Sequence, residues 1–230
     1  MPGIEASLRA VRARMGAAER ENGRAAGEVG LLAVSKTFDA LAVRQAWEAG
    51  QRVFGESYLQ EALDKMAQLA DLPIEWHFIG PLQSNKTRPV ANHFAWVHSV
   101  DRLKIAQRLS EQRDIHLPPL NVCVQVNVSG EASKSGVAPA EVPALLAAVT
   151  ALPRLRLRGL MCIPEPTGDA ALARGRFAQL RQLRDRANEA EGLAMDTLSM
   201  GMSDDMEWAI AEGATLVRVG SAIFGDRPAA

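Results

Sequence analysis

Eight short apolar runs recur along the chain, and a helical pattern separates each run from the next. The runs are 29–35, 52–55, 75–80, 96–100, 120–128, 157–163, 197–201 and 216–220. The helical windows between them are 39–50, 57–70, 84–92, 101–113, 139–151, 169–191 and 203–213. Strands that alternate with helices are typical of βαβ units, in which the strands pair in parallel. Because the runs are nearly continuously apolar, we expect a sheet that is covered on both faces.

Eight such strands are the number that closes a (β/α)8 barrel of the TIM type, and the sequence therefore predicts an α/β fold of this kind. An amphipathic helix in the first 23 residues is expected as an addition in front of the barrel. A doubly wound open sheet is the alternative fold. The chain has 230 residues and short connections, so we expect one domain over 1–230.

Charge and composition exclude several classes of protein. The formal net charge is −1 and acidic and basic residues are interspersed, so no basic field exists to bind nucleic acid. No run approaches the roughly 18 apolar residues of a membrane span, and the N-terminus lacks the apolar core of a signal peptide. We therefore expect a cytoplasmic protein without a membrane or nucleic-acid partner.

The cysteines and histidines give no sign of a metal site. Cys123 and Cys162 both lie within apolar runs, so we expect two buried, reduced thiols. The four histidines show no metal-ligand spacing. The glycine and serine motifs of P-loop, dinucleotide-binding and serine hydrolase proteins are absent after every predicted strand.

Lys36 directly follows the apolar residues of the first predicted strand. The carboxyl ends of barrel strands form the face that carries reactive groups in barrel enzymes. Apolar surroundings disfavour the ammonium form of a lysine, and the neutral amine can then condense with an aldehyde to a Schiff base. An ordinary surface lysine is the alternative interpretation of this position.

A second candidate site joins the ends of the seventh and eighth predicted strands, where each strand is followed by Gly, Ser and a helix start. The candidate oxyanion donors are the amide groups of Met202, Ser203, Gly220 and Ser221. Barrels frequently bind phosphate at this place. Alternatively, Ser203 only caps the following helix. If phosphate binds here, the Asp204 and Asp205 side chains should point outward, because they would repel a dianion.

Three further polar residues could line the mouth of the barrel. Arg218 lies between two valines of the eighth strand, so its guanidinium needs an acceptor if it points inward. The alternative is outward packing against a helix carboxylate. His77 could line the mouth or could be a hydrogen-bonded residue of the barrel, and Ser57 follows the second strand.

Taken together, these residues resemble the pyridoxal phosphate homeostasis family, the YggS/PROSC group, which is related to the N-terminal barrel of alanine racemase. The matching segments are 31–37, 54–61, 76–86, 126–136, 159–164, 198–210 and 217–225. The resemblance implies a fold type III barrel that binds pyridoxal 5′-phosphate (PLP) as a monomer.

The resemblance also implies a role for each candidate residue. Lys36 would be the Schiff-base lysine, and Arg218 would face the pyridine nitrogen. The phosphate would be held by Ser203, Gly220 and Ser221, with Ser57, His77 and Met202 as further cofactor contacts. Ser57 stands where the family usually has Asn, and this difference puts that contact in question.

The function that the resemblance implies is intracellular PLP homeostasis, by reversible Schiff-base binding and transient delivery to apo-enzymes. A PLP-dependent racemase or decarboxylase is the alternative, but it needs a second acid or base. The racemases resemble one another in taking that base from an added domain and a partner subunit, for which this chain has no residues. Tyr58, the only tyrosine, is a poor substitute, so we expect no catalytic residues and no turnover. A Schiff-base aldolase and a mainly protein-docking role are further alternatives.

Overall fold

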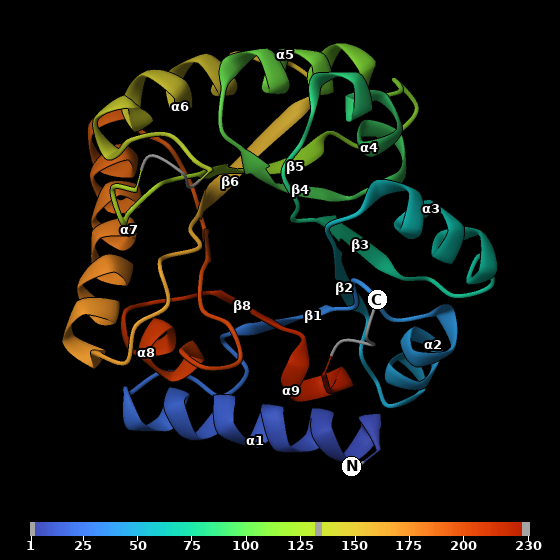
Figure 1. Ribbon diagram of the computed structural model, residues 1–230. Coiled ribbons are helices and arrows are strands. Elements are labelled where there is room, and N and C mark those ends of the chain that lie inside the picture. The colour runs from blue at the N-terminus through green and yellow to red at the C-terminus, as the bar shows by residue number, and fades with distance from the viewer. Residues whose placement is uncertain (1–2, 132–134, 227–230) are drawn as a thin grey trace.

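Eight parallel strands close into a barrel in chain order in the computed structural model, which describes residues 3–131 and 135–226 (Figure 1). The strands are β1 (Gly30–Val34), β2 (Val53–Glu56), β3 (Glu75–Phe78), β4 (Trp96–Val100), β5 (Leu120–Gln125), β6 (Leu155–Met161), β7 (Thr197–Ser199) and β8 (Leu216–Val219). The barrel closes between β1 and β8, where Leu32 is paired with Arg218. This pairing confirms the predicted barrel and excludes the open sheet.

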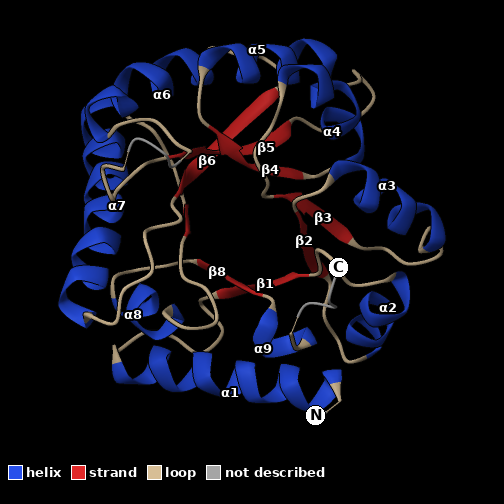
Figure 2. Ribbon diagram, viewed as in Figure 1, coloured by secondary structure: helices blue, strands red, loops and turns tan. Residues whose placement is uncertain are grey.

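A ring of helices surrounds the strands (Figure 2). The helices are α1 (Ile4–Glu21), α2 (Ala40–Glu48), α3 (Leu59–Gln68), α4 (Thr87–His93), α5 (Leu103–Gln112), α6 (Val142–Thr150), α7 (Ala170–Glu191), α8 (Met206–Ala211) and α9 (Ser221–Phe224). Short 3-10 turns at Ser84–Lys86 and Pro139–Glu141 precede α4 and α6. Within the described residues, no helix is both long and apolar enough to cross a bilayer.

Helix α1 takes the eighth position of the outer ring. The helix that follows β8 is only four residues long, and α1 lies beside it, between α8 and α2 (Figure 1). Its buried side chains Leu8, Val11, Met15 and Ala18 recur every three or four residues and form one apolar face. The additional N-terminal helix is therefore confirmed, and it completes the layer that covers the strands.

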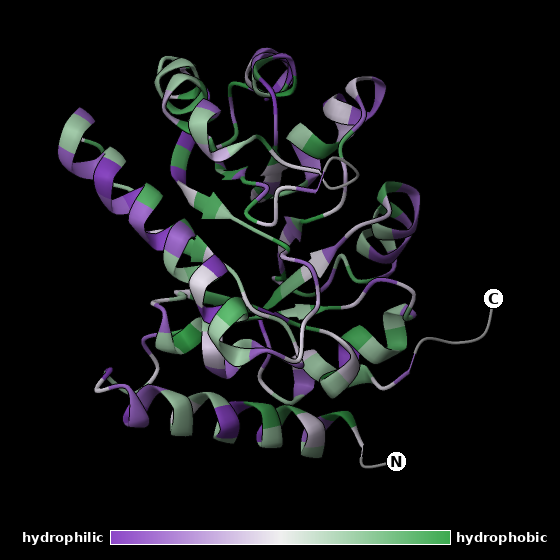
Figure 3. Cartoon of the chain, turned by 60° about the vertical axis from the view of Figure 1, so that its left-hand side comes forward, coloured by the Kyte–Doolittle hydropathy of each residue, from purple (hydrophilic) through white to green (hydrophobic). Residues whose placement is uncertain are grey.

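Residue chemistry explains where the main elements begin and end. Asp39 and Asp169 cap α2 and α7, since each side chain accepts a hydrogen bond from an amide of the first turn. Gly192 ends α7 in the left-handed region. The strands at the centre are mainly hydrophobic, whereas the surrounding helices carry residues of both kinds (Figure 3).

Both cysteines are free and fully buried, as the apolar runs around them predict. Burial raises the pKa of the Cys123 and Cys162 thiols to about 12. Cys123 packs with Trp96 and Met161 in a small apolar cluster. Neither thiol therefore carries reactive thiolate at neutral pH.

Candidate functional site

A cavity of about 180 Å³ lies at the carboxyl ends of β1 and β8. The polar residues that line it are Lys36, Ser57, Ser203, Arg218 and Ser221, and the others are Val34, Phe38, Ile79, Ile163, Met202, Gly220 and Gly225. All residues expected at the site line this cavity except His77. The structure thus brings together segments that are far apart in the sequence, at the face where barrel proteins place their chemistry.

The backbone on both sides of Lys36 is fixed by hydrogen bonds. The Ser35 amide donates to the carbonyl of Gly55 at 3.0 Å, and the Thr37 amide donates to Glu61 Oε1 at 2.7 Å. Thr37 has a φ of 71°, in the left-handed region that a β-branched residue rarely adopts. Such a conformation persists only where its surroundings impose it. Lys36 is half-buried and follows β1 directly into the cavity wall.

A buried charge network lies next to this segment. Lys65 Nζ of α3 donates to the Ser35 carbonyl at 2.7 Å, to Glu56 Oε1 at 2.8 Å and to Glu61 Oε1 at 2.5 Å. The Ser35 hydroxyl also donates to Glu56 Oε1, at 2.6 Å. Burial raises the pKa of the fully buried Glu56 carboxyl, although the Lys65 ammonium and the Ser35 hydroxyl act in the opposite direction. The network holds both neighbours of Lys36.

Lys65 and Glu61 were not among the site residues predicted from the sequence. Their spacing of four residues on a helix is the usual signal of an ion pair, but most such pairs lie on the surface. Burial of this pair depends on Glu56, which comes from the neighbouring strand. The informative signal was the occurrence of Glu56 at a strand end, a few residues before the pair.

Ser203, Gly220 and Ser221 line the cavity where the segments after β7 and β8 meet. The Ser221 hydroxyl donates to Ser203 Oγ at 3.2 Å, so the loops after β7 and β8 meet here. A Cβ at Gly220 would lie 3.1 Å from the carbonyl oxygen of Val34. Gly201 has a φ of 91°, and a Cβ there would lie 2.5 Å from that of Ala209. Gly201 thus leaves no room for a side chain against α8, and Gly220 lies close to the end of β1.

One expectation about this loop requires correction. Asp204 is exposed, but Asp205 turns inward and its Oδ1 accepts a hydrogen bond of 2.6 Å from the Met202 amide. Burial raises the pKa of the Asp205 carboxyl. Met202 lines the cavity, but its amide already donates to Asp205 and therefore does not serve as an oxyanion donor here. The nearby carboxylate competes with any ligand for that N–H.

Arg218 points inward, which excludes the alternative of outward packing. Its Nη1 donates to the carbonyl and hydroxyl oxygens of Ser199 at 2.7 and 2.9 Å, and Nη2 donates to the Cys162 carbonyl at 2.8 Å. Burial lowers the pKa of this guanidinium, which is 3% exposed. It nevertheless remains protonated, since an arginine is not deprotonated at physiological pH.

His77 lies inside the barrel, away from the cavity lining. Its Nε2 is 2.8 Å from Glu75 Oε1 and its Nδ1 is 2.9 Å from Nε2 of His98. The structure therefore supports the interpretation of His77 as a hydrogen-bonded barrel residue. Among the described residues, no cluster of three or more His, Cys, Asp or Glu side chains could hold a metal ion.

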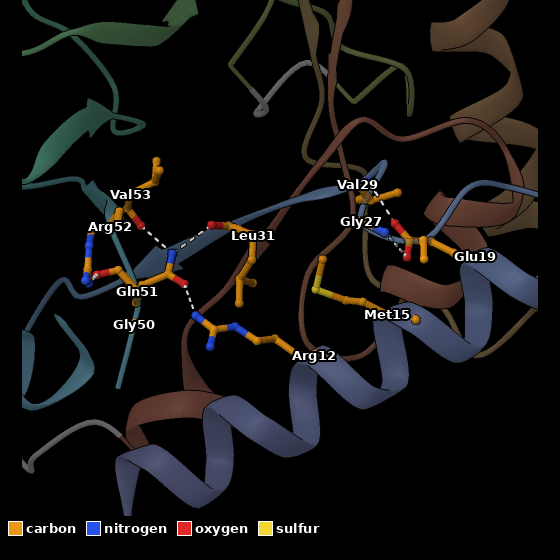
Figure 4. A pocket seen from close by; sticks show the side chains of 12 residues that line it. Arg12, Met15, Glu19, Gly27, Val29, Leu31, Gly50, Gln51, Arg52 and Val53 are labelled. Carbon is orange, nitrogen blue, oxygen red and sulfur yellow. Dashed lines mark hydrogen bonds between the residues drawn. The ribbon is translucent and has the colours of Figure 1, made fainter. Parts of the chain in front are cut away.

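A second hollow, of about 480 Å³, lies between α1 and the amino ends of β1 and β2 (Figure 4). Arg12 of α1 donates to Gln51, and Gln51 Nε2 donates to the carbonyl groups of Leu31 and Val53. Glu19 accepts hydrogen bonds from the amides of Gly27 and Val29. These groups attach α1 to the barrel, so the hollow lies at the structural junction between α1 and the strands β1 and β2.

Comparisons with known proteins agree with the fold. The family model of the alanine racemase N-terminal domain matches residues 7–228. Of the segments that carry the family resemblance in the sequence, the one at 126–136 falls partly outside the described residues, since 132–134 are not among them. The pyridoxal phosphate homeostasis protein of Pseudomonas aeruginosa is 65% identical over 99% of this chain and 97% of its own length. That of Escherichia coli is 52% identical over 99% and 98%.

Solved structures also match this fold. The structure of PipY from Synechococcus elongatus with PLP bound has a TM-score of 0.85 and 39% identity, covering 96% of this chain and 100% of that one. Alanine racemase from Corynebacterium glutamicum, at 19% identity and a TM-score of 0.69, covers 97% of this chain and 62% of that one. The racemase likeness concerns the barrel fold alone.

Proposed function

Since this chain belongs to the pyridoxal phosphate homeostasis family, built on the alanine racemase N-terminal domain, we propose that it binds PLP reversibly at Lys36 and acts in PLP homeostasis. The observation that carries the proposal is the convergence of an amine, a guanidinium and two hydroxyls on one cavity. PLP carries an aldehyde, a ring nitrogen and a phosphate that match these groups.

The residues present fit this cofactor. The hydroxyls of Ser203 and Ser221 suit phosphate oxygens, and the inward Asp205, which binds the Met202 amide, is not among the described residues that line the cavity. Arg218 is fixed by three hydrogen bonds to Ser199 and Cys162, and it borders the cavity. Phe38, Ile79 and Ile163 provide apolar walls, as expected for a site that encloses an aromatic ring.

The chemistry follows from the side chains. When bound, PLP supplies an aldehyde that forms a covalent bond with a lysine amine and releases water. Lys36 provides that amine, and the hydrogen bonds at Ser35 and Thr37 fix the backbone on either side of it. Arg218 can donate a hydrogen bond to a ring nitrogen, but a guanidinium cannot take up that nitrogen's proton. The ring then stays a weak electron sink, which disfavours carbanion chemistry.

We propose that binding occurs without turnover. Racemisation or decarboxylation requires a second positioned acid or base beside the lysine. Tyr58 is half-exposed, and within the described part of the chain it is not among the residues that line the cavity. Loading and release at the open mouth of a single-domain monomer would suit transient transfer to apo-enzymes in the cytoplasm.

The first test is the visible absorption spectrum of the purified protein with added PLP, followed by borohydride reduction and peptide mapping. We expect a visible Schiff-base band and one modified peptide carrying Lys36. Lys36→Ala should remove the band and the modified peptide and leave the fold intact. Lys104→Ala is the control, since Lys104 is exposed on α5. Reductive labelling that persists in Lys36→Ala would contradict the assignment.

A further inference from the structure

A continuous chain of hydrogen bonds crosses the interior of the barrel and ends at the cofactor cavity. It begins at Glu75 Oε1, which lies 2.8 Å from His77 Nε2, and His77 Nδ1 lies 2.9 Å from His98 Nε2. His98 Nδ1 lies 2.8 Å from Ser199 Oγ, which accepts from Arg218 Nη1 at 2.9 Å. The five residues come from β3, β4, β7 and β8.

This path must run through the centre of the barrel. Strand β4 pairs with β3 and β5, and β7 pairs with β6 and β8, so β4 and β7 are not neighbours in the sheet. The contact between His98 and Ser199 therefore joins two strands across the interior. Barrel interiors are normally filled by apolar side chains, which makes a polar path there unusual.

The carboxylate end of the chain and the neutral state of the two buried histidines together determine the direction of every hydrogen bond in it. A guanidinium can only donate, and an ionised carboxylate can only accept. Nε2–H of His77 therefore donates to Glu75. With both rings neutral, Nδ1 of His77 accepts from Nε2–H of His98, and Nδ1 of His98 accepts the proton of the Ser199 hydroxyl, whose oxygen accepts from Arg218. Each ring nitrogen is used once, and each neutral histidine carries its proton on Nε2.

Burial and charge agree with this assignment. His77, His98 and Ser199 are at most 2% exposed, whereas the Glu75 side chain is half-exposed. Burial lowers the pKa of His77, and it lowers the pKa of His98 well below its usual range, with the neighbouring His77 and Arg218 acting in the same direction. A proton added to Nδ1 of His77 would place two N–H groups against each other, and a proton added to Nδ1 of His98 would replace the hydrogen bond that this nitrogen accepts from Ser199.

We propose that His77, His98 and Ser199 are positioning residues that hold Arg218 toward the cofactor ring through a chain of fixed polarity anchored on Glu75. This inference rests on the proposed function, because it assigns these residues a role in holding PLP. Arg218 is the one member of the chain that lines the cavity, and the others act through it. The role of Arg218 at the ring is thus set from the opposite end of the barrel.

The first experiment determines the tautomers of His77 and His98 in the ligand-free protein. The sequence contains only four histidines, so side-chain ¹⁵N–¹H correlation spectra of histidine-labelled protein can be assigned with single variants of the exposed His93 and His116. We expect His77 and His98 to be neutral Nε2–H tautomers at pH 7. An Nδ1–H tautomer or a charged ring at either position would overturn the proposal.

The second experiment removes one link. Ser199→Ala deletes the hydroxyl and leaves the backbone carbonyl, so we expect His98 to lose its single tautomer and the Kd for PLP to rise about tenfold. Ser199→Thr keeps a hydroxyl and should restore both properties. The matched control is Ser110→Ala, because Ser110 is a buried serine of α5 outside the cavity. Unchanged PLP affinity in folded Ser199→Ala would overturn the proposal.

A variant at the surface covers the case in which Ser199→Ala fails to fold. Glu75→Ala removes the terminal acceptor from a half-exposed position, and we expect His77 to lose its tautomer preference and PLP to bind more weakly. Unchanged tautomers and affinity would overturn the proposal. If the wild-type protein took up no PLP, the proposed function would fail, while the tautomers of the ligand-free protein would still report on the chain.

Discussion

Replacement of Lys65 by methionine would test how the buried charge network beside Lys36 contributes to stability. Methionine keeps most of the volume of the lysine stem, so the main change is the loss of the ammonium group. Lys65 is 3% exposed and Glu56 is fully buried. Removal of one partner of such a pair leaves an uncompensated buried charge, which costs about 3–5 kcal/mol. For a chain of this size, the Tm should fall by roughly 10 °C.

The stability cost of Lys65→Met should also depend on pH. The pKa of Glu56 is already raised by burial, and loss of Lys65 removes two contributions that lower it. A carboxyl group whose pKa is higher in the folded than in the unfolded state takes up a proton on folding. Its stabilising effect is complete below the unfolded pKa and is lost as the pH rises through the folded pKa. Lys65→Met should therefore cost less stability at pH 5 than at pH 8.

Urea unfolding at both pH values provides the measurement. Lys104→Met is the control, because Lys104 is exposed and its replacement should change the free energy of unfolding by less than about 0.5 kcal/mol. The double variant Glu56→Gln/Lys65→Met should recover much of the loss, since it removes the unpaired charge. The reasoning would be refuted if Lys65→Met matched the control or had the same cost at both pH values.

Two further predictions concern the loop after β7 and the buried thiols. Gly201→Ala should lower stability by roughly 1–3 kcal/mol and weaken PLP binding, because the added Cβ meets Ala209 at a positive φ. The control is Gly175→Ala in α7, where a Cβ would meet nothing within 4 Å, and it should be neutral or stabilising. Equal effects of the two substitutions on the Tm in a thermal melt would contradict the argument. Cys123 and Cys162, with pKa values of about 12, should not react with a thiol reagent at pH 8 until the protein unfolds, so rapid modification of the native protein would disprove their burial.

The sequence predicted the barrel because apolar runs and helical windows are local signals. Lys36, Arg218 and Ser221 could be placed at one face of the barrel, where they line the cavity, because each immediately follows or lies within such a run. The inward turn of Asp205 could not be predicted, since it depends on one hydrogen bond within a loop. The chain through His98 is invisible in local patterns, because His98 meets Ser199 only after the barrel has closed.

The position of α1 has a consequence for how the chain folds during its synthesis. The apolar face of α1 packs on α8 and α9, and β1 pairs with β8, so α1 and β1 emerge from the ribosome well before these partners. Until β8 is made, α1 keeps an uncovered apolar face and β1 keeps an open edge. Contacts between such distant segments slow folding, and exposed edges and faces favour aggregation. Closure of the ring is thus necessarily a late event, and the cavity that holds Lys36 and Arg218 forms only with it.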